Sequence, residues 1–481
     1  MGQAQYLDGY DFTAIHEKAR EVLTHTKRLK QSAREKYLNY FETKCKGSKE
    51  SIEAAKEHIP GGIQHNLANN YPFGLNCVKS EGAYLYDVDG NKYIDFLQAG
   101  GPTILGNNYR PVTDAVIDTL NSVGHLTGLY GEFETDLAKK VKQYFPSVEL
   151  FRMTGSGTEA CMIAIRLARA YTEKENIIKI KGTYHGWSDQ LMYEIRSIGS
   201  GSTAAVGVPN ECYNHISAVF PNDLEELEKV FEENEKKGGT AAFLIEPLGQ
   251  DSGALPLTLE FHKRVRELCD KYNAMLIYDE VVSAFRIGMG GCQELFGIRP
   301  DLTVFGKILA GGFVGAGGVG GKREIMEQLT AGITLGKSTK VMVGGTLTAN
   351  PVSCVAGYNA ICELERTDAH RKLKEASDKF TREVADIAAK YDIPALVFNQ
   401  DSILHIDLSG TQHVASFREY SKEQIAARSA QAMQDMHEYA MAMCAEGIIV
   451  AGGNKTFINL QTIPVLDDAL EIIDKVFSQY E

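Results

Sequence analysis

The 481-residue sequence has no long apolar run, so no membrane-spanning helix is expected. It also lacks a basic surplus, because 50 Lys and Arg stand against 63 Asp and Glu, which gives a formal net charge of −13. Nucleic acids and anionic membranes require basic surface on a protein, and neither is therefore expected as a partner. The amino-terminal segment lacks the apolar core of a signal peptide, which indicates a cytoplasmic protein.

The nine cysteines are scattered and are never spaced as CxxC. This spacing predicts buried thiols in a reducing compartment, and neither a disulfide framework nor a metal site is expected. The sequence shows no internal repeat and no low-complexity segment.

The length and the pattern of apolar residues predict several domains. Residues 1–56 are expected to form a helical amino-terminal extension, and residues 57–106 the first part of a small domain. That part includes "GAYLYDVDGNKYIDF", Gly82 to Phe96, whose alternating apolar runs and Asp-Gly turn predict a β-hairpin. Residues 107–366 are expected to form a large domain, and residues 367–481 the rest of the small α+β domain.

Short apolar strands alternate with amphipathic helices along the large domain. The strand candidates are "NIIKIKG", "TAAFLIEPLG", "AMLIYDEV" and "LTVFGK". Between two of them, "LEFHKRVRELCDKYN" places Phe261, Val265 and Leu268 on one helical stripe. This alternation predicts an α/β fold with a parallel sheet covered by helices on both faces.

Three groups of side chains follow the predicted strands, where open α/β sheets bind ligands. The first is a Gly-Ser-Gly-Thr turn that runs into a helix and includes Ser156, Gly157 and Thr158. Small residues and free N–H groups at a helix start can hold a phosphate, although a plain helix N-cap accounts for the same residues. The turn is neither a Walker loop nor the GxGxxG fingerprint.

The second group is Tyr184 and His185, between two glycines at the end of a predicted strand. The Tyr184 ring can stack on a flat ligand, while the alternative is a pair that packs and bonds to backbone.

The third group is Asp279 and Lys307, which follow two neighbouring predicted strands. A desolvated lysine at such a place can act as a Schiff-base nucleophile, and a buried aspartate can keep a heterocyclic nitrogen protonated. A structural salt bridge is the alternative for the two residues alone. Together with the turn and the aromatic residue, however, they match what pyridoxal 5′-phosphate requires.

The sequence resembles the class III (subgroup II) aminotransferases of fold type I, most closely their glutamate-1-semialdehyde 2,1-aminomutase branch. The resemblance extends from about Pro60 to the carboxyl terminus. It rests on "GAYLYDVDGNKYIDF", "GSGTEACMIAIRLARAYT", "YHG", "DEVVSAFR", "GGCQELFGIRPDLTVFGKILAGG" and "GGTLTANPVSCVAG", together with Glu246–Pro247. It implies a large domain with a mostly parallel, seven-stranded sheet and a smaller α+β domain.

The resemblance also implies roles for individual residues. Lys307 would form the Schiff base with pyridoxal 5′-phosphate, and Asp279 would pair with the pyridine nitrogen. Tyr184 and Val281 would lie on either side of the ring. The remaining cofactor-binding residues that the resemblance implies are Ser156, Gly157, Thr158, His185, Glu246 and Thr346. Thr346 would come from the partner subunit of a homodimer, so the active site would lie at the subunit interface.

The substrate side departs from the aminomutase branch. Ala68 stands where that branch has an arginine that binds the substrate carboxylate, and Gly100 replaces a tryptophan. The segment "AGGNKTF" is a shortened loop, and its Lys455 is the nearest cationic candidate in the sequence. These differences favour a transaminase that moves an amino group from an amino acid or amine to a 2-oxo acid, and predict negligible conversion of glutamate-1-semialdehyde. An amino-acid racemase or an aminomutase is the alternative.

Overall fold

The computed structural model describes residues 3–24, 27–66, 72–195, 201–330, 341–410, 412–418, 420–451 and 455–481. The chain divides into two compact units. The first contains Met1–Tyr109 and Asp368–Glu481, and the second contains Arg110–Thr367. Ala68 and residues 452–454 lie outside the described residues.

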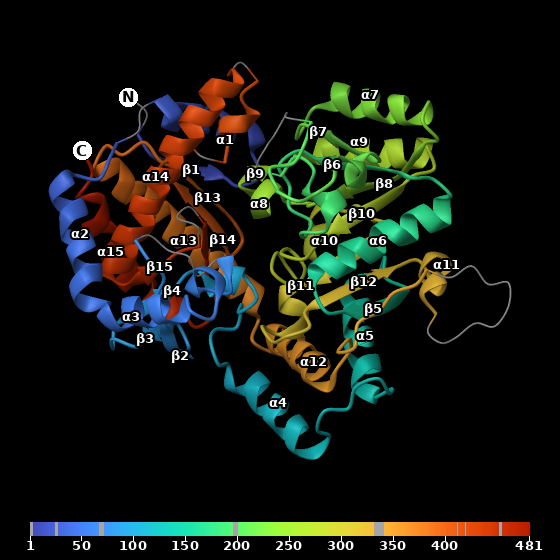
Figure 1. The fold of residues 1–481 in the computed structure, drawn as a ribbon, viewed down its shortest axis with the longest axis horizontal. Coiled ribbons are helices and arrows are strands. Elements are labelled where there is room, and N and C mark those ends of the chain that lie inside the picture. Colours follow the sequence, from blue (N-terminus) through green and yellow to red (C-terminus); the bar gives the residue numbers. More distant parts are fainter. Residues whose placement is uncertain are drawn as a thin grey trace. The chain divides into compact units, whose positions relative to one another are not determined.

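The second unit contains a seven-stranded sheet in the order β5-β12-β11-β10-β8-β6-β7 (Figure 1). Strand β12 runs antiparallel to β11 and β5, whereas the other neighbouring pairs are parallel. The strands are β5 (Leu150–Thr154), β6 (Asn176–Ile180), β7 (Ile216–Val219), β8 (Thr240–Ile245), β10 (Met275–Asp279), β11 (Leu302–Gly306) and β12 (Gly317–Gly321). This arrangement confirms the predicted α/β class and the mostly parallel sheet.

Helices cover both faces of this sheet. On one face, helix α6 (Gly157–Thr172) packs through residues such as Ala164 against Ile177, Leu244 and Val304 of the strands. Helices α7 (Leu224–Glu235) and α9 (Leu259–Lys271) pack on the other face. The predicted stripe of α9, which is Phe261, Val265 and Leu268, is buried there. Burial on both faces explains why strand sequences are continuously apolar.

The remaining elements of the second unit are α4 (Arg110–Ser122), α5 (Glu132–Tyr144), α8 (Gln250–Gly253), β9 (Leu255–Pro256), α10 (Gly291–Phe296), α11 (Arg323–Met326) and α12 (Pro351–Arg366). Among them, α12 packs against α4 and α5.

The first unit contains two four-stranded sheets, in the orders β1-β13-β14-β16 and β15-β4-β3-β2. The predicted hairpin is present, because Tyr84 of β3 pairs antiparallel with Ile94 of β4. The strands are β1 (Gln5–Asp8), β2 (Cys77–Glu81), β3 (Tyr84–Asp87), β4 (Lys92–Asp95), β13 (Leu396–Gln400), β14 (Ile403–Asp407), β15 (Ile448–Ile449) and β16 (Lys455–Phe457). Its helices are α1 (Phe12–Thr24), α2 (Gln31–Lys44), α3 (Lys46–Ala55), α13 (Ala369–Lys390), α14 (Lys422–Glu446) and α15 (Leu466–Phe477).

The amino-terminal segment contains the helices α1, α2 and α3 and the short strand β1. Helix α1 buries Ile15, Ala19 and Val22 in a cluster with Phe398. Strand β1, which the sequence did not predict, pairs with β13 and so extends that sheet. The nine cysteines are all free, and no helix in the described ranges has the length and low charge needed to cross a membrane.

Candidate active site

Asp279 and Lys307 lie at the same edge of the large sheet. Asp279 ends β10 and pairs in register with Val304 of the parallel strand β11, and Lys307 follows Gly306, the last residue of β11. Because parallel strands present their carboxyl ends at one edge, both residues lie where α/β sheets bind ligands. Lys307 has φ +48, a left-handed conformation that is uncommon for a residue with a side chain and is often found at functional positions.

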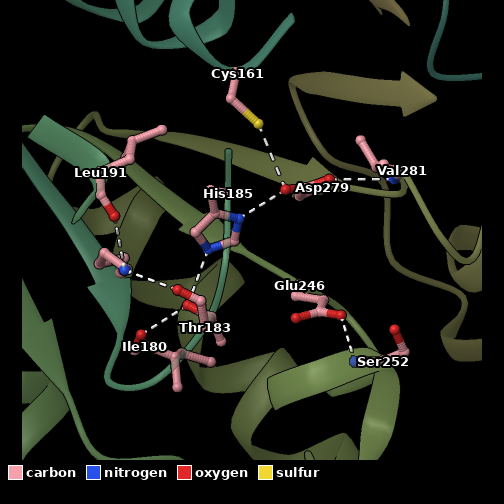
Figure 2. Close-up of polar contacts among 10 residues, drawn as sticks. Cys161, Ile180, Thr183, His185, Leu191, Glu246, Ser252, Asp279 and Val281 are labelled. Carbon is pink, nitrogen blue, oxygen red and sulfur yellow. Dashed lines mark hydrogen bonds and ion pairs between the residues drawn. The ribbon is translucent and has the colours of Figure 1, made fainter. Parts of the chain in front are cut away.

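The Asp279 carboxylate is buried, with 5% of the residue exposed, and accepts three hydrogen bonds. Nδ1 of His185 lies 2.7 Å from Oδ2, Sγ of Cys161 donates to the same oxygen at 3.4 Å, and the Val281 amide donates to Oδ1 at 3.1 Å. Figure 2 shows these contacts converging on the carboxylate. These three donors fix the orientation of the carboxylate.

His185 is buried, and burial lowers its pKa, so the neutral imidazole is favoured. In the neutral form Nδ1–H donates to Asp279, and Nε2 lies 3.0 Å from the oxygen of the Thr183 hydroxyl, which donates its own proton to the Ile180 carbonyl at 2.7 Å. A neutral His185 leaves the negative charge of Asp279 uncompensated. That charge is then available to a protonated ligand nitrogen.

The Gly-Ser-Gly-Thr turn begins α6 and packs closely against the neighbouring loops. The Ser156 hydroxyl accepts from the Glu159 amide at 3.3 Å, so the predicted N-cap is present. A β-carbon at Gly157 would lie 2.8 Å from Cγ2 of Val281, and one at Gly186 would lie 2.7 Å from Cα of Thr158. The glycines therefore let Val281 and the Tyr184–Gly186 loop approach the start of the helix.

This turn fits a phosphate group. The first amides of a helix have no partner within the helix, and the helix dipole favours an anion there. Gly157 lacks a side chain that would fill the space beside Val281. Gly306 packs on the same valine, because a β-carbon at Gly306 would lie 2.7 Å from Cγ1 of Val281. The turn, Val281 and Asp279 could therefore hold a phosphate, a ring face and a protonated ring nitrogen.

The other predicted residues differ in how they are placed. Tyr184 is 55% exposed, which leaves its ring accessible to a ligand. Glu246, directly after β8, is buried, and its Oε1 accepts from the Ser252 amide at 2.6 Å, so one carboxylate oxygen stabilises the following turn. Thr346 is exposed. Gly100 and Lys455 belong to the first unit.

Three residues at the site were not predicted from the sequence. Cys161 contacts Asp279, Thr183 contacts His185, and Lys179 contacts Thr183. Cys161 was treated as one of several buried thiols, yet it lies one helical turn after Gly157 and therefore on the face of α6 that meets Asp279. Thr183 precedes the Tyr-His pair and could have been noticed by that position. Lys179 interrupts an otherwise apolar strand, and a charge inside such a run was the available signal.

Sequence and structure comparisons agree on the nature of this chain's relatives. The profile of the family described as "Aminotransferase class-III" matches residues 66–476. Glutamate-1-semialdehyde 2,1-aminomutase of Legionella pneumophila (strain Corby) is 39% identical over 352 residues, which cover 72% of this chain and 80% of that protein. An omega-transaminase from Sphaerobacter thermophilus has a similar fold, with a TM-score of 0.82 and 27% identity over 92% of this chain and 99% of its own. A structure described as a transaminase with PLP bound gives a TM-score of 0.79 and 26% identity, covering 90% of this chain and 98% of its own.

Proposed function

Because the chain belongs to the class-III aminotransferase family, we propose that it moves amino groups on small molecules with pyridoxal 5′-phosphate as its cofactor. The observation that carries this proposal is the buried Asp279, aimed by His185 and Cys161 at the strand edge that also bears Lys307. When bound, pyridoxal phosphate withdraws electrons from the carbon that carries the substrate amine and makes its C–H bond acidic.

The side chains then have distinct tasks. Lys307 would hold the cofactor covalently through Nζ, and its free amine would serve as the base that takes the proton from the substrate carbon. Asp279 keeps the ring nitrogen protonated, since its negative charge favours the cation. The amides at the start of α6, with Ser156, Gly157 and Thr158, hold the phosphate, and Tyr184 and Val281 contact the two ring faces.

Two reactions can follow from that proton transfer. The name of the Legionella relative favours an intramolecular shift of the amino group, which is the aminomutase reaction. The aminomutase, which was the alternative in the sequence analysis, is therefore better supported than the transaminase that the sequence analysis favoured. Ala68 replaces the carboxylate-binding arginine expected in that branch. We therefore propose that the enzyme isomerises an amino carbonyl compound other than glutamate-1-semialdehyde, or that it binds glutamate-1-semialdehyde weakly.

Transfer between two molecules is the second candidate, and Gly100 favours it. Gly100 has φ +82, a left-handed conformation that strains any residue with a β-carbon. An aromatic side chain is therefore unfavourable at this position, where the aminomutase branch has tryptophan. The absence of that tryptophan is a departure from the aminomutase branch, and this departure supports transfer between two molecules as the second candidate. A racemase uses the same proton abstraction and would differ in returning the proton to the same carbon.

One experiment separates these reactions. The purified enzyme is converted to its pyridoxamine form, and 2-oxo acids and amino carbonyl compounds, glutamate-1-semialdehyde included, are added separately while the cofactor absorbance is followed. With an amino carbonyl compound we expect the pyridoxal form to appear only transiently, together with a diamine, and the pyridoxamine form to return as the isomerised amino carbonyl compound is released. Conversion to the pyridoxal form with a 2-oxo acid, together with formation of its amino acid, would instead establish transamination.

We further propose that the enzyme acts in the cytoplasm as a homodimer, with Thr346 of one subunit completing the phosphate site of the other. The exposure of Thr346 supports this proposal, because a residue that serves a neighbouring subunit has to be at the surface. The free state of all nine cysteines is consistent with a reducing compartment.

A further inference from the structure

Lys179 is a fully buried lysine on strand β6, and the reaction outlined above does not use it. All five residues of β6 are buried, and Lys179 itself is 0% exposed. Its neighbours Ile178 and Ile180 belong to one core layer, so Lys179 points with Ile177 to the other face, where α6 packs. Burying an ammonium in such a layer is costly unless each of its protons has a partner.

The Nζ atom of Lys179 has three partners, all of them backbone carbonyls. It donates to the carbonyl of Thr183 at 2.9 Å, of Tyr193 at 3.1 Å and of Leu191 at 3.4 Å. An ammonium has three N–H groups, and this number matches the three acceptors. A neutral amine would leave one carbonyl facing its lone pair. The geometry therefore fits the charged form.

The tethered segment carries the residues that contact the cofactor aspartate. Thr183 lies two residues before His185, and its hydroxyl is 3.0 Å from Nε2 of that ring. Nδ1 of the same ring lies 2.7 Å from Asp279. A continuous set of contacts thus links Lys179, through Thr183 and His185, to Asp279, as the dashed lines around Thr183 and His185 show in Figure 2.

The charge of Lys179 acts on the same residues. Burial lowers the pKa of Lys179 to about 7, while the negative charges of Glu194 and Glu246 favour its charged form. Burial is the main reason that the pKa of His185 is low, and the positive charge of Lys179 adds to it. Lys179 thus helps to keep His185 neutral, and a neutral His185 leaves the Asp279 charge available to the ring nitrogen.

We propose that Lys179 is a positioning residue for the cofactor site: by joining the carbonyls of Thr183, Leu191 and Tyr193, it fixes the loop that aims His185 at Asp279. The proposal rests on the proposed function, because it concerns the cofactor that Asp279 is expected to bind. Lys179 touches none of the reacting atoms and acts through Thr183 and His185.

The test compares Lys179→Met with Lys181→Met, a lysine two residues along the chain whose Nζ pairs with Glu226 at 2.7 Å. The first readout is the downfield proton NMR signal of the His185 Nδ1–H in cofactor-free protein, assigned by its loss in His185→Gln. The second is the affinity for pyridoxal phosphate, measured by absorbance titration. We expect Lys179→Met to lose the signal and to bind the cofactor about 10-fold or more weakly, whereas Lys181→Met behaves as wild type.

A double mutant shows whether Lys179 acts through His185. If it does, Lys179→Met combined with His185→Gln binds the cofactor as weakly as His185→Gln alone, because the second change removes an interaction already lost. Additive losses, or a wild-type His185 signal in Lys179→Met, would overturn the proposal.

Loss of three hydrogen bonds can prevent Lys179→Met from folding, so Thr183→Val and Thr183→Ser provide a second test. Thr183→Val removes the hydroxyl that faces Nε2 and is expected to shift the His185 signal, while Thr183→Ser keeps it. A wild-type signal and affinity in Thr183→Val would also overturn the proposal. If wild-type protein binds no pyridoxal phosphate, the proposed function fails, but the His185 signal still decides the role of Lys179.

Discussion

Nδ1 of His185 and Oδ2 of Asp279 lie 2.7 Å apart in a buried part of the large unit, and burial favours the neutral imidazole. The pair therefore carries a net negative charge. A pyridine nitrogen placed beside it would gain a proton more readily than in water, and the proposed electron withdrawal depends on that proton. The sequence predicts this role for Asp279, and the contact with a neutral His185 explains how the aspartate can keep its charge available.

Replacement of Asp279 by asparagine tests the charge. Asp279→Asn keeps the shape of the side chain but removes the negative charge, so the ring nitrogen loses its proton and proton abstraction slows by about 100-fold or more. Cofactor content is expected to stay near that of wild type. The measurement is the single-turnover rate of the half-reaction. Asp270→Asn, at an exposed aspartate that pairs with Arg266, is the control, and a wild-type rate in Asp279→Asn would contradict the role.

His262 gives the enzyme a sensitivity to acid. This buried residue lies 2.9 Å from the Pro247 carbonyl through Nε2 and 3.0 Å from the Tyr278 hydroxyl through Nδ1, and burial lowers its pKa to about 4. In the unfolded chain the ordinary histidine pKa is about 6.5. Below pH 6.5 the unfolded chain therefore binds a proton that the folded protein refuses, and stability falls as the pH drops towards 4.

The expected loss from His262 is about 3 kcal/mol across that window, with no contribution above it. Urea unfolding at a series of pH values measures it. His262→Gln should show a shallower loss than wild type between pH 6.5 and 4, whatever its stability at neutral pH. Equal slopes for the two proteins would show that His262 does not titrate on unfolding.

Much of the fold could be predicted because its signals are local. The strands β6, β8, β10 and β11 read as apolar runs bounded by turns, and the β3–β4 hairpin contains Asp-Gly. Strand β12 could not be predicted from its sequence, "GGVGG", since glycine has low strand propensity. The structure explains these glycines, because a β-carbon at Gly318 would lie 2.7 Å from the Phe151 ring and one at Gly320 would lie 2.6 Å from Val148.

The apolar segment "TFINLQT" contributes only its first two residues to a strand. Strand β16 ends at Phe457, because the Asn459 side chain accepts from the amides of Gln461 and Thr462 at 2.9 Å and closes a turn. The residues of the candidate site also differ in how clearly the sequence indicates them. Asp279 and Lys307 stand out as charges after apolar strands, whereas Thr183 and Cys161 are marked only by their positions beside the predicted site, and their contacts depend on tertiary packing.

Covalent attachment at Lys307 can be tested directly. Borohydride reduction of the purified protein followed by peptide mapping is expected to place the pyridoxyl group on Lys307. Lys307→Ala should bind the cofactor without a covalent bond and turn over at a negligible rate. Buried Lys179, the other lysine near the site, is the informative comparison. Modification there, or at any residue except Lys307, would overturn the assignment.

The shared site can be tested with mixed subunits. Lys307→Ala subunits and Thr346→Ala subunits are each expected to be inactive or impaired as homodimers. A hybrid of the two contains one site in which both residues are intact, so mixing should restore part of the activity. Tagged subunits and mass spectrometry confirm that hybrids form. Hybrids without restored activity would show that Thr346 serves its own subunit.

The contact between Gly157 and Val281 allows a test by rescue. Alanine at Gly157 places a β-carbon 2.8 Å from Cγ2 of Val281, and the valine has to move from the position proposed for the ring face. Alanine otherwise suits a helix better than glycine, by about 1 kcal/mol, so Gly157→Ala is expected to weaken cofactor binding without lowering the melting temperature. Adding Val281→Ala removes the clash, and cofactor affinity should rise above that of Gly157→Ala alone. Gly155→Ala is the control in the same turn, because its β-carbon would meet the flexible end of Glu159, which can move aside. If Val281→Ala does not raise affinity in the Gly157→Ala background, the clash with Val281 is not what weakens cofactor binding in Gly157→Ala.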